Sequence, residues 1–367
     1  MDKVLFDLSN PNDISEIRRI LLDDDANEDP ALVEDLGEES DLDSQDEVVQ
    51  REDDSATEQE EGATEDEEEE DDIRTGYFIG RDKHTKWTRK PSPAAARRIQ
   101  CHNIITHLPG VRGEAKNAKT ILQCWECLFS TEMLELIVES TNKYIDSVKD
   151  KFARERDAKG TDVIEIKAFI GLLYLAGAYR GNRQSLEELW GTEGDGIEKF
   201  GLAMSIKRFK FLIRCIRFDD RTSRGQRKVY DRLCPIRELF DHFVRNCRKN
   251  YIPGENVTVD EMLPGFRGRC AFRQYIPSKP SKYGIKLFAL VDAKMIYTYN
   301  FEIYAGKQSE GPFSVSNRPS EVVKRFAEPL FETGRNITAD NWFTDIDLIN
   351  DLKKKKLSYV GTIRKNK

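Results

Sequence analysis

The sequence lacks any apolar run long enough to cross a bilayer. The longest run, residues 168–179, has 12 residues and includes two glycines, whereas a membrane-spanning helix needs about 20 apolar residues. The first residues also lack the apolar core of a signal peptide. The seven cysteines are an odd number, and we expect them to be reduced thiols rather than a disulfide framework. These absences argue against a membrane protein and against a disulfide-stabilised secreted domain.

Aromatic residues are absent from positions 23–72, and apolar residues are few there. Residues 1–72 hold 31 acidic and 4 basic residues, a net charge of −27, while the rest of the chain carries +19. Such a segment cannot bury enough apolar surface to offset the entropy of ordering, so we predict a disordered acidic tail over residues 1–72. A leader that only improves solubility is the alternative. The basic remainder suits a polyanionic partner.

Residues 73–114 form a basic stretch around Pro91 and Pro93, which we interpret as a linker. It could carry a nuclear-import signal or contact DNA, and a solvated connector is an equal alternative. Its cations include Arg81, Lys83, Lys86, Arg89, Lys90, Arg97 and Arg98.

Residues 115–255 are predicted to form a helical domain. Apolar residues near helical spacing predict helices over 132–151, 164–179 and 206–218, and Pro235 is expected to open another. Two pairs have the spacing of helix N-terminal caps and mark further helix starts. These pairs are Asp162 with Glu165 and Ser185 with Glu188.

From residue 256 the pattern changes to alternating strands and helices, which predicts an α/β fold with the element order βββαβαβ. The expected strands cover 256–260, 286–291, 295–304, 336–340 and 357–362, and the expected helices cover 320–331 and 344–354.

Two pentapeptides in this region share one pattern, NVTVD at residues 256–260 and NITAD at residues 336–340. Each alternates polar and apolar residues, as a strand with two distinct faces does, and each ends in an aspartate. If the two strands pair side by side, Asp260 and Asp340 come together and can bind a hard divalent cation, Mg²⁺ or Mn²⁺. Such a site supports metal-dependent phosphoryl transfer. Aspartate after a strand is also a common turn former or helix cap, and that simpler interpretation stays open.

Acidic residues are missing from residues 262–290, directly after Asp260. Cations there can neutralise phosphates, and the interleaved rings of Phe266, Phe272 and Tyr275 can stack on unpaired bases. A solvated loop whose aromatic residues pack on the core is the alternative. The candidate DNA-binding residues are Arg267, Arg269, Arg273, Lys279, Lys282 and Lys286.

Two stretches resemble piggyBac-type transposases and their domesticated derivatives. They are VDEMLPGFRGRCAFRQYIPSKPSKYGIK at residues 259–286 and ADNWFT at residues 339–344, and the resemblance extends over residues 115–367. It implies an RNase H-like catalytic core of the DDE transposase type over residues 256–367, in which Asp260 and Asp340 match the first two of three catalytic aspartates. It also implies that the helical domain serves dimerisation and DNA binding, and that the protein acts on DNA in the nucleus.

The resemblance places the third aspartate on a helix well beyond Asp340, and a zinc-binding cysteine-rich domain after that, whereas the sequence ends at Lys367. We therefore expect a C-terminally incomplete core with a partial metal-dependent strand-transfer site. Three interpretations stay open. They are an active DDE transposase if the chain continues past residue 367, a domesticated derivative that binds DNA or chromatin without cutting it, and a non-functional fragment.

No other acid is a convincing third ligand. On a strand, Glu261 would point to the face opposite Asp260, and Asp292 is expected to lie in a hairpin turn. Trp342, two residues after Asp340, is expected to pack in the core. Surface or helix-start positions are expected for Asp345, Asp347 and Asp351.

A zinc site is not expected. Cys124 and Cys127 form a single C-x-x-C, and the residues upstream that could complete a ligand set fit no standard pair of zinc knuckles in their spacing. Buried thiols on one face of a helix are the preferred interpretation. The upstream residues in question are Cys101, His102 and His107.

Overall fold

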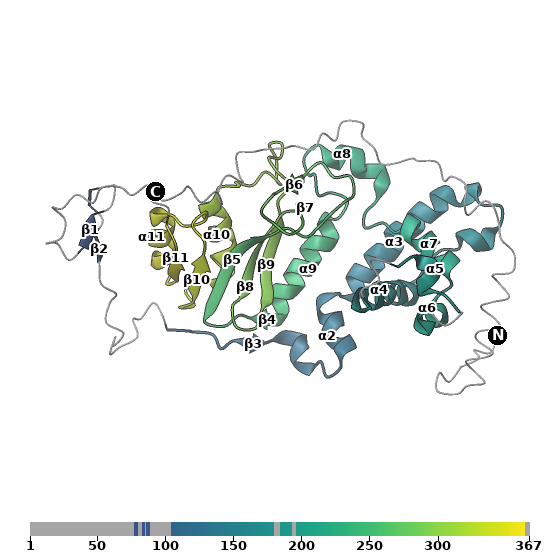
Figure 1. Cartoon of the computed structure of the whole chain (residues 1–367), viewed down its shortest axis with the longest axis horizontal. Coiled ribbons are helices and arrows are strands. Elements are labelled where there is room, and N and C mark those ends of the chain that lie inside the picture. The colour runs from purple at the N-terminus through teal and green to yellow at the C-terminus, as the bar shows by residue number, and fades with distance from the viewer. Residues whose placement is uncertain are drawn as a thin grey trace. The chain divides into compact units, whose positions relative to one another are not determined.

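The computed structural model describes residues 77–79, 83–84, 86–88, 104–179, 184–192 and 196–363. These divide into two compact units (Figure 1), one within Leu128–Phe243 and the other within Ser44–Cys127 together with Val244–Lys367. The predicted tail over residues 1–72 lies outside the described residues, so the predicted four-part division stays a prediction. No described helix is both long and apolar enough to span a membrane.

The first unit is helical. Asp162 caps α4 by accepting a hydrogen bond from the amide of Glu165, and Ser185 and Glu188 form a reciprocal capping box at α5, so both predicted helix starts are confirmed. The helices are α3 Thr131–Val148, α4 Val163–Ala178, α5 Leu186–Leu189, α6 Glu198–Ala203, α7 Ile206–Cys215 and α8 Arg224–Lys228.

The second unit is built around a five-stranded mixed sheet with the strand order β11-β10-β5-β8-β9. Strand β10 pairs in parallel with both β5 and β11, whereas β5, β8 and β9 form an antiparallel meander. The predicted order βββαβαβ is confirmed. The elements are β5 Asn256–Met262, β8 Leu287–Asp292, β9 Tyr297–Ile303, α10 Pro319–Ala327, β10 Asn336–Ala339, α11 Ile346–Lys354 and β11 Ser358–Gly361.

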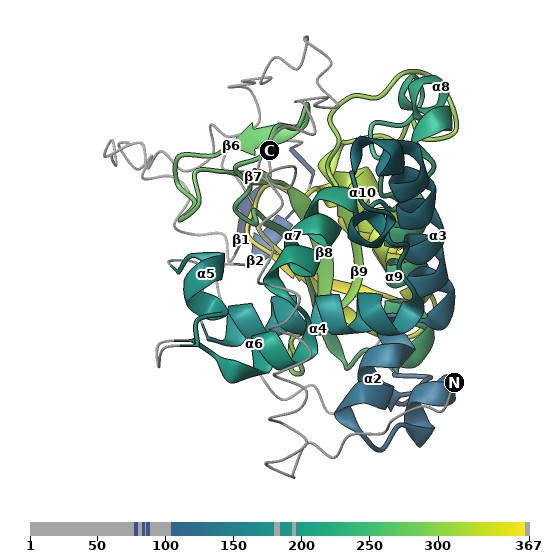
Figure 2. The ribbon, with the colours of Figure 1, turned by 90° about the vertical axis from the view of Figure 1, so that its right-hand side faces the viewer.

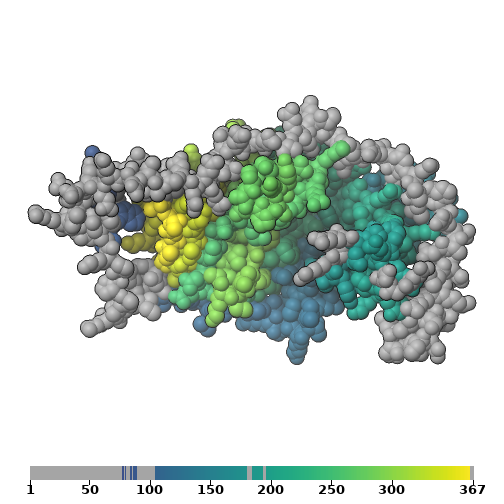
Figure 3. All heavy atoms as spheres, in the orientation of Figure 1, coloured from purple at the N-terminus to yellow at the C-terminus, as the bar shows by residue number. Residues whose placement is uncertain are grey.

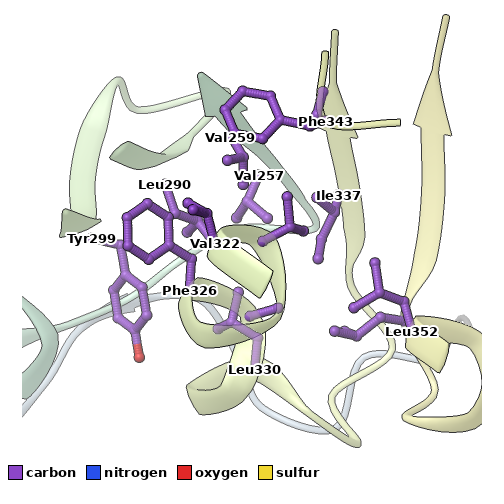
Figure 4. Packing of buried hydrophobic residues seen from close by; sticks show 14 of the residues in the cluster. Val257, Val259, Leu290, Tyr299, Val322, Phe326, Leu330, Ile337, Phe343 and Leu352 are labelled. Carbon is purple, nitrogen blue, oxygen red and sulfur yellow. The ribbon is translucent and has the colours of Figure 1, made fainter. Parts of the chain in front are cut away.

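Helices α10 and α11 cover one face of this sheet. Val257, Val259 and Ile337 are fully buried there, because the period of two along β5 and β10 sends every second side chain to this face. Figure 4 shows these side chains pointing from the strands toward Val322 and Phe326 of α10. The cluster fixes the register of both strands, since a slip by one residue would expose the whole apolar set.

Several short strands were not predicted. Strand β3 (Gly110–Val111), which precedes α2 (Ile121–Leu128), pairs with β4 (Tyr251–Ile252), which directly follows α9 (Arg237–Asn250). In the predicted linker, β1 (Tyr77–Ile79) pairs with β2 (Lys86–Thr88). Pairs this short lack the alternating apolar run that identifies a strand from sequence.

Asp292 differs from its predicted place as a simple turn residue. It does begin the turn between β8 and β9, but its side chain is fully buried. Its carboxylate accepts hydrogen bonds from the Tyr251 hydroxyl (2.8 Å) and from the amides of Gly254 (2.6 Å), Lys294 (2.9 Å) and Met295 (3.0 Å). Asp292 thus ties the β8–β9 turn to the segment that precedes β5, at the end of the sheet opposite Asp260.

Candidate metal and DNA site

Asp260 lies near the carboxyl end of β5, and Asp340 directly follows the neighbouring strand β10. Strands β5 and β10 are parallel and in register from Asn256 opposite Asn336 to Val259 opposite Ala339, so the residue after this register is an aspartate in both segments. Paired strands are about 4.8 Å apart. The sheet therefore places Asp260 beside Asp340, as the two pentapeptides predict.

Each carboxylate is held by backbone amides through one of its oxygens. The Asp260 Oδ1 atom accepts from the amide of Glu261 (2.7 Å), and the Asp340 Oδ1 atom accepts from the amides of Trp342 (3.0 Å) and Phe343 (3.3 Å). Among the described residues, the Oδ2 atom of neither aspartate has a hydrogen-bond partner. One oxygen of each side chain is therefore anchored and the other is open to a ligand.

Asp340 also forms the turn that the simpler interpretation predicted, because it accepts hydrogen bonds from residues two and three positions later. It is not the cap of the following helix. That cap is Asp345, whose side chain accepts from the amide of Asp347 at the start of α11. One oxygen of Asp340 forms the turn and the other is available to a ligand, so the interpretation as a turn residue does not exclude the interpretation as a metal ligand.

The pKa of the Asp260 carboxyl is raised above its ordinary value. The largest cause is the loss of surrounding water, and the nearby charges of Glu261 and Asp340 raise the pKa further. The amide of Glu261 and the ammonium of Lys279 oppose these effects without cancelling them. A bound cation would relieve the excess of negative charge, which is the electrostatic condition of a metal site.

The remaining acids of the region are engaged elsewhere. Glu261 forms an ion pair with Lys279 (3.3 Å), and Asp351 forms ion pairs with Lys324 (3.0 Å) and Lys354 (3.0 Å). Within the described part of the chain there is no group of three or more histidine, cysteine or acidic side chains that could hold a metal ion. Two carboxylates nevertheless fit Mg²⁺, which commonly takes one or two carboxylates together with water and substrate phosphates.

The acid-free segment forms an arm beyond the end of β5 (Figures 1 and 2). We define the arm as residues 264–285, which contain β6 (Arg273–Tyr275) paired antiparallel with β7 (Tyr283–Ile285). Gly284 is required in β7, because an added Cβ would lie 2.3 Å from the carbonyl oxygen of Pro264. This close approach holds β7 against the first residues of the arm, which follow β5 in the chain.

The arm presents cations and rings together at the surface, and Figure 3 shows this part of the chain in green. The rings of Tyr275 and Tyr283 lie 4.7 Å apart and are both more than a third exposed, as is Phe266. Of the predicted DNA-binding residues, the structure brings five into the arm. Arg267, Arg269 and Lys282 are exposed, Lys279 lies beside Glu261, and Arg273 folds back over Tyr283.

Lys286, the sixth predicted DNA-binding residue, lies in a different environment from the other five. It is only 8% exposed. Its ammonium lies over the rings of Trp342 (4.9 Å), Phe288 (5.1 Å) and Tyr304 (5.7 Å). Trp342 packs on Phe288 with nearly parallel rings, as its predicted place in the core requires. The sequence signal for a buried lysine was its position between Ile285 and Leu287 at the start of a strand.

The C-x-x-C pair lies on α2, but the preferred interpretation of two buried thiols is wrong, because Cys124 is exposed and Cys127 is only half-buried on a helix that has no buried residue. Burial raises the pKa of the Cys127 thiol. Two of the three upstream residues weighed as zinc ligands, Cys101 and His102, lie outside the described residues, so the zinc prediction is not tested.

Comparison with known proteins gives concordant matches. The profile of the family described as Transposase IS4 matches residues 121–367. Human "PiggyBac transposable element-derived protein 3" is 25% identical over 253 residues, which cover 68% of this chain and 40% of that protein. Human "PiggyBac transposable element-derived protein 2" is 24% identical over 246 residues, which cover 65% of this chain and 39% of that protein.

A solved structure is also similar, a piggyBac transposase synaptic complex with hairpin DNA. Its chain is 36% identical, with a TM-score of 0.65, over 71% of this chain and 54% of that one. The chain therefore spans about two fifths of the curated relatives' length, and about half of the solved one.

Proposed function

The chain belongs to the piggyBac family of transposases and transposase-derived proteins, and from this membership we propose that it binds DNA through the arm and carries part of a metal-dependent DNA strand-transfer site. The observation that carries the proposal is the register of β5 and β10, which sets Asp260 beside Asp340 next to an arm without acids. The RNase H-like assignment of the core rests on the same sheet order.

In this proposal Asp260 and Asp340 would hold a divalent cation when DNA is bound. The ion would supply Lewis-acid stabilisation of the charge that develops on the phosphate oxygens. The backbone amides of Glu261 and Trp342 fix the two carboxylates before DNA arrives. The arm neutralises phosphates through its exposed cations and offers the rings of Tyr275 and Tyr283 to bases.

A second candidate function is DNA binding without strand cleavage. The observation that favours it is the absence of a third metal-binding side chain near the two aspartates within the described residues. The two candidates share the arm and differ at the carboxylates, so DNA affinity and metal dependence separate them.

Support for DNA as the partner comes from the solved neighbour, which is a transposase complex with DNA, and from the net charge of +19 on residues 73–367. We further propose a nuclear location and self-association through the helical unit. Both follow from the family rather than from a contact in this structure.

Replacing Arg267, Arg269 and Lys282 together by alanine is expected to weaken DNA binding and its salt dependence. Each cation that neutralises a phosphate releases counterions, so the slope of log K against log salt should fall by roughly 1 per lost contact. Fluorescence anisotropy with a labelled duplex at several salt concentrations measures both quantities.

A matched control removes the same charge elsewhere, by replacing Lys353, Lys354 and Lys355, which are exposed at the end of α11. If the control loses as much affinity and slope as the arm variant, net charge governs DNA binding and the arm has no special role.

Removing residues 1–72 is expected to raise DNA affinity at low salt. The tail carries a net charge of −27, and it would compete with DNA for the basic surface of the same chain. The gain should fade as salt screens both interactions. Anisotropy titrations of the shortened chain measure it, with a tail of equal length and neutral composition as control. Unchanged affinity at low salt would refute the competition.

A further inference from the structure

Lys286 stands at the joint between the arm and the sheet. It is the single residue between β7, which ends at Ile285, and β8, which begins at Leu287. Its carbonyl oxygen accepts a hydrogen bond from the amide of Tyr304 (2.9 Å), which fixes the backbone of the joint to the segment after β9. Lys286 is thus one of the two residues that join the arm to the sheet, the other being Leu263 after the end of β5.

The side chain of Lys286 reaches the turn that carries Asp340. Its ammonium lies 4.9 Å from the centre of the Trp342 ring, and the ring of Phe288 stacks on Trp342 at 5.6 Å with an interplanar angle of 16°. The backbone amide of Trp342 donates to the Asp340 Oδ1 atom (3.0 Å). A continuous series of contacts thus runs from the joint through the indole to one of the two carboxylates.

We propose that Lys286 is a positioning residue, which holds Trp342 and thereby orients Asp340 relative to Asp260 when the arm engages DNA. The inference rests on the proposed function, because it assigns Lys286 to the same metal site. It replaces the expected role of Lys286 as a direct DNA contact.

Two physical features support this role. A lysine ammonium attracts the face of tryptophan more strongly than other rings, and the attraction is larger where water is excluded, as it is around a side chain that is 8% exposed. The second is the position of the neighbours, since of the three rings that the ammonium lies over, Trp342 is the one in the turn that holds a proposed metal ligand.

The test compares Lys286→Met, which keeps the unbranched stem and removes the charge, with the wild-type chain. Terbium serves as the probe for the carboxylates, with luminescence excited through the indole, and Trp342→Phe shows which signal comes from Trp342. Lys286→Met should weaken terbium binding roughly tenfold, the loss expected from one desolvated cation–π contact. It should also shift the Trp342 emission of the metal-free protein, while DNA affinity without metal stays unchanged.

Two variants control for folding and for loss of charge. Lys286→Arg keeps a cation over the rings and should bind terbium nearly as the wild type does. Lys355→Met removes another lysine that lies over a ring, that of Phe331 at 5.4 Å, and should leave terbium affinity unchanged. Thermal melting verifies that each variant is folded.

The outcomes separate the inference from the function on which it rests. If folded Lys286→Met binds terbium as tightly as the wild type, the positioning role is wrong while the metal site stands. If the wild type binds terbium no better than Asp260→Asn does, the proposed metal site fails, and the positioning role fails with it.

Discussion

Asp260→Asn is expected to abolish the effect of Mn²⁺ on DNA binding and, at the same time, to raise the melting temperature of the metal-free protein. A cation held between two carboxylates and a phosphate should tighten the complex. The asparagine side chain can still accept the hydrogen bond from the amide of Glu261. It cannot supply the negative charge that Asp260 would add to that of Asp340 at the metal site. Any Mn²⁺-dependent nicking of DNA by the protein should disappear with the same substitution.

The rise in stability follows from the direction of the pKa shift. The pKa of Asp260 is raised, chiefly by loss of water around the carboxyl. A carboxyl whose pKa is higher in the folded chain adds stability below its unfolded pKa and loses it as the pH rises through the folded value. At pH 7 the ionised Asp260 is therefore destabilising. For the same reason, metal affinity should fall with decreasing pH earlier than at an ordinary aspartate.

Melting curves and anisotropy titrations, each with and without Mn²⁺, measure both effects of Asp260→Asn. Asp347→Asn provides a matched control, because Asp347 is an exposed aspartate in the first turn of α11. A lower melting temperature for Asp260→Asn, together with an unchanged Mn²⁺ effect, would identify Asp260 as a structural turn residue.

Asp292→Asn is expected to have the opposite effect on stability, a loss of about 3–5 kcal/mol in the free energy of unfolding. The two oxygens of the buried carboxylate each accept two hydrogen bonds, from Tyr251 and Gly254 on one side and from Lys294 and Met295 on the other. An asparagine must turn its NH₂ group toward one of these pairs of donors. That side would then carry buried donors without an acceptor.

The pH dependence of this contribution has the opposite sign from that of Asp260. Burial would raise the pKa of Asp292, but the hydrogen bonds from Met295, Gly254, Tyr251 and Lys294 outweigh it and lower the pKa. The contribution of Asp292 is thus complete above its unfolded pKa of about 4 and is lost as the pH falls below that range.

Urea unfolding followed by tryptophan fluorescence, with Trp342→Phe identifying the contribution of Trp342, reports on the sheet unit that contains Asp292. Asp347→Asn should change the free energy of unfolding by less than about 0.5 kcal/mol. A comparably small change for Asp292→Asn would mean that the four hydrogen bonds contribute little. Folded Asp292→Asn protein should still bind metal, because Asp292 lies at the end of the sheet away from Asp260.

The sequence predicted the sheet well where the pattern was local and repeated. Residues 256–260 and 336–340 alternate strictly, and each became a strand within one or two residues of the predicted bounds. Their pairing could be anticipated because both strands bury the same apolar face and end in the same residue type. The two capping pairs of the helical unit were equally local, since both partners lie within one helical turn.

Interactions that join distant segments were not predictable. Asp292 reads as a turn residue from its neighbours, and its burial depends on Tyr251 and Gly254, about forty positions earlier. Strands β6 and β7 have three residues each and no apolar alternation, so nothing in the sequence marked the arm as a hairpin. Lys286 was grouped with the other cations of the segment because of its charge, and its contact with Trp342, which lies far along the chain, could not be predicted from the sequence.

Mn²⁺ binding to the metal-free protein, measured by electron paramagnetic resonance, is the most direct test of a metal site formed by Asp260 and Asp340. The wild type is expected to bind Mn²⁺ at a site that Asp260→Asn and Asp340→Asn each remove, and the double variant is expected to be no weaker than either single one. Equal Mn²⁺ binding by the wild type and both single variants would contradict a metal site at the ends of β5 and β10.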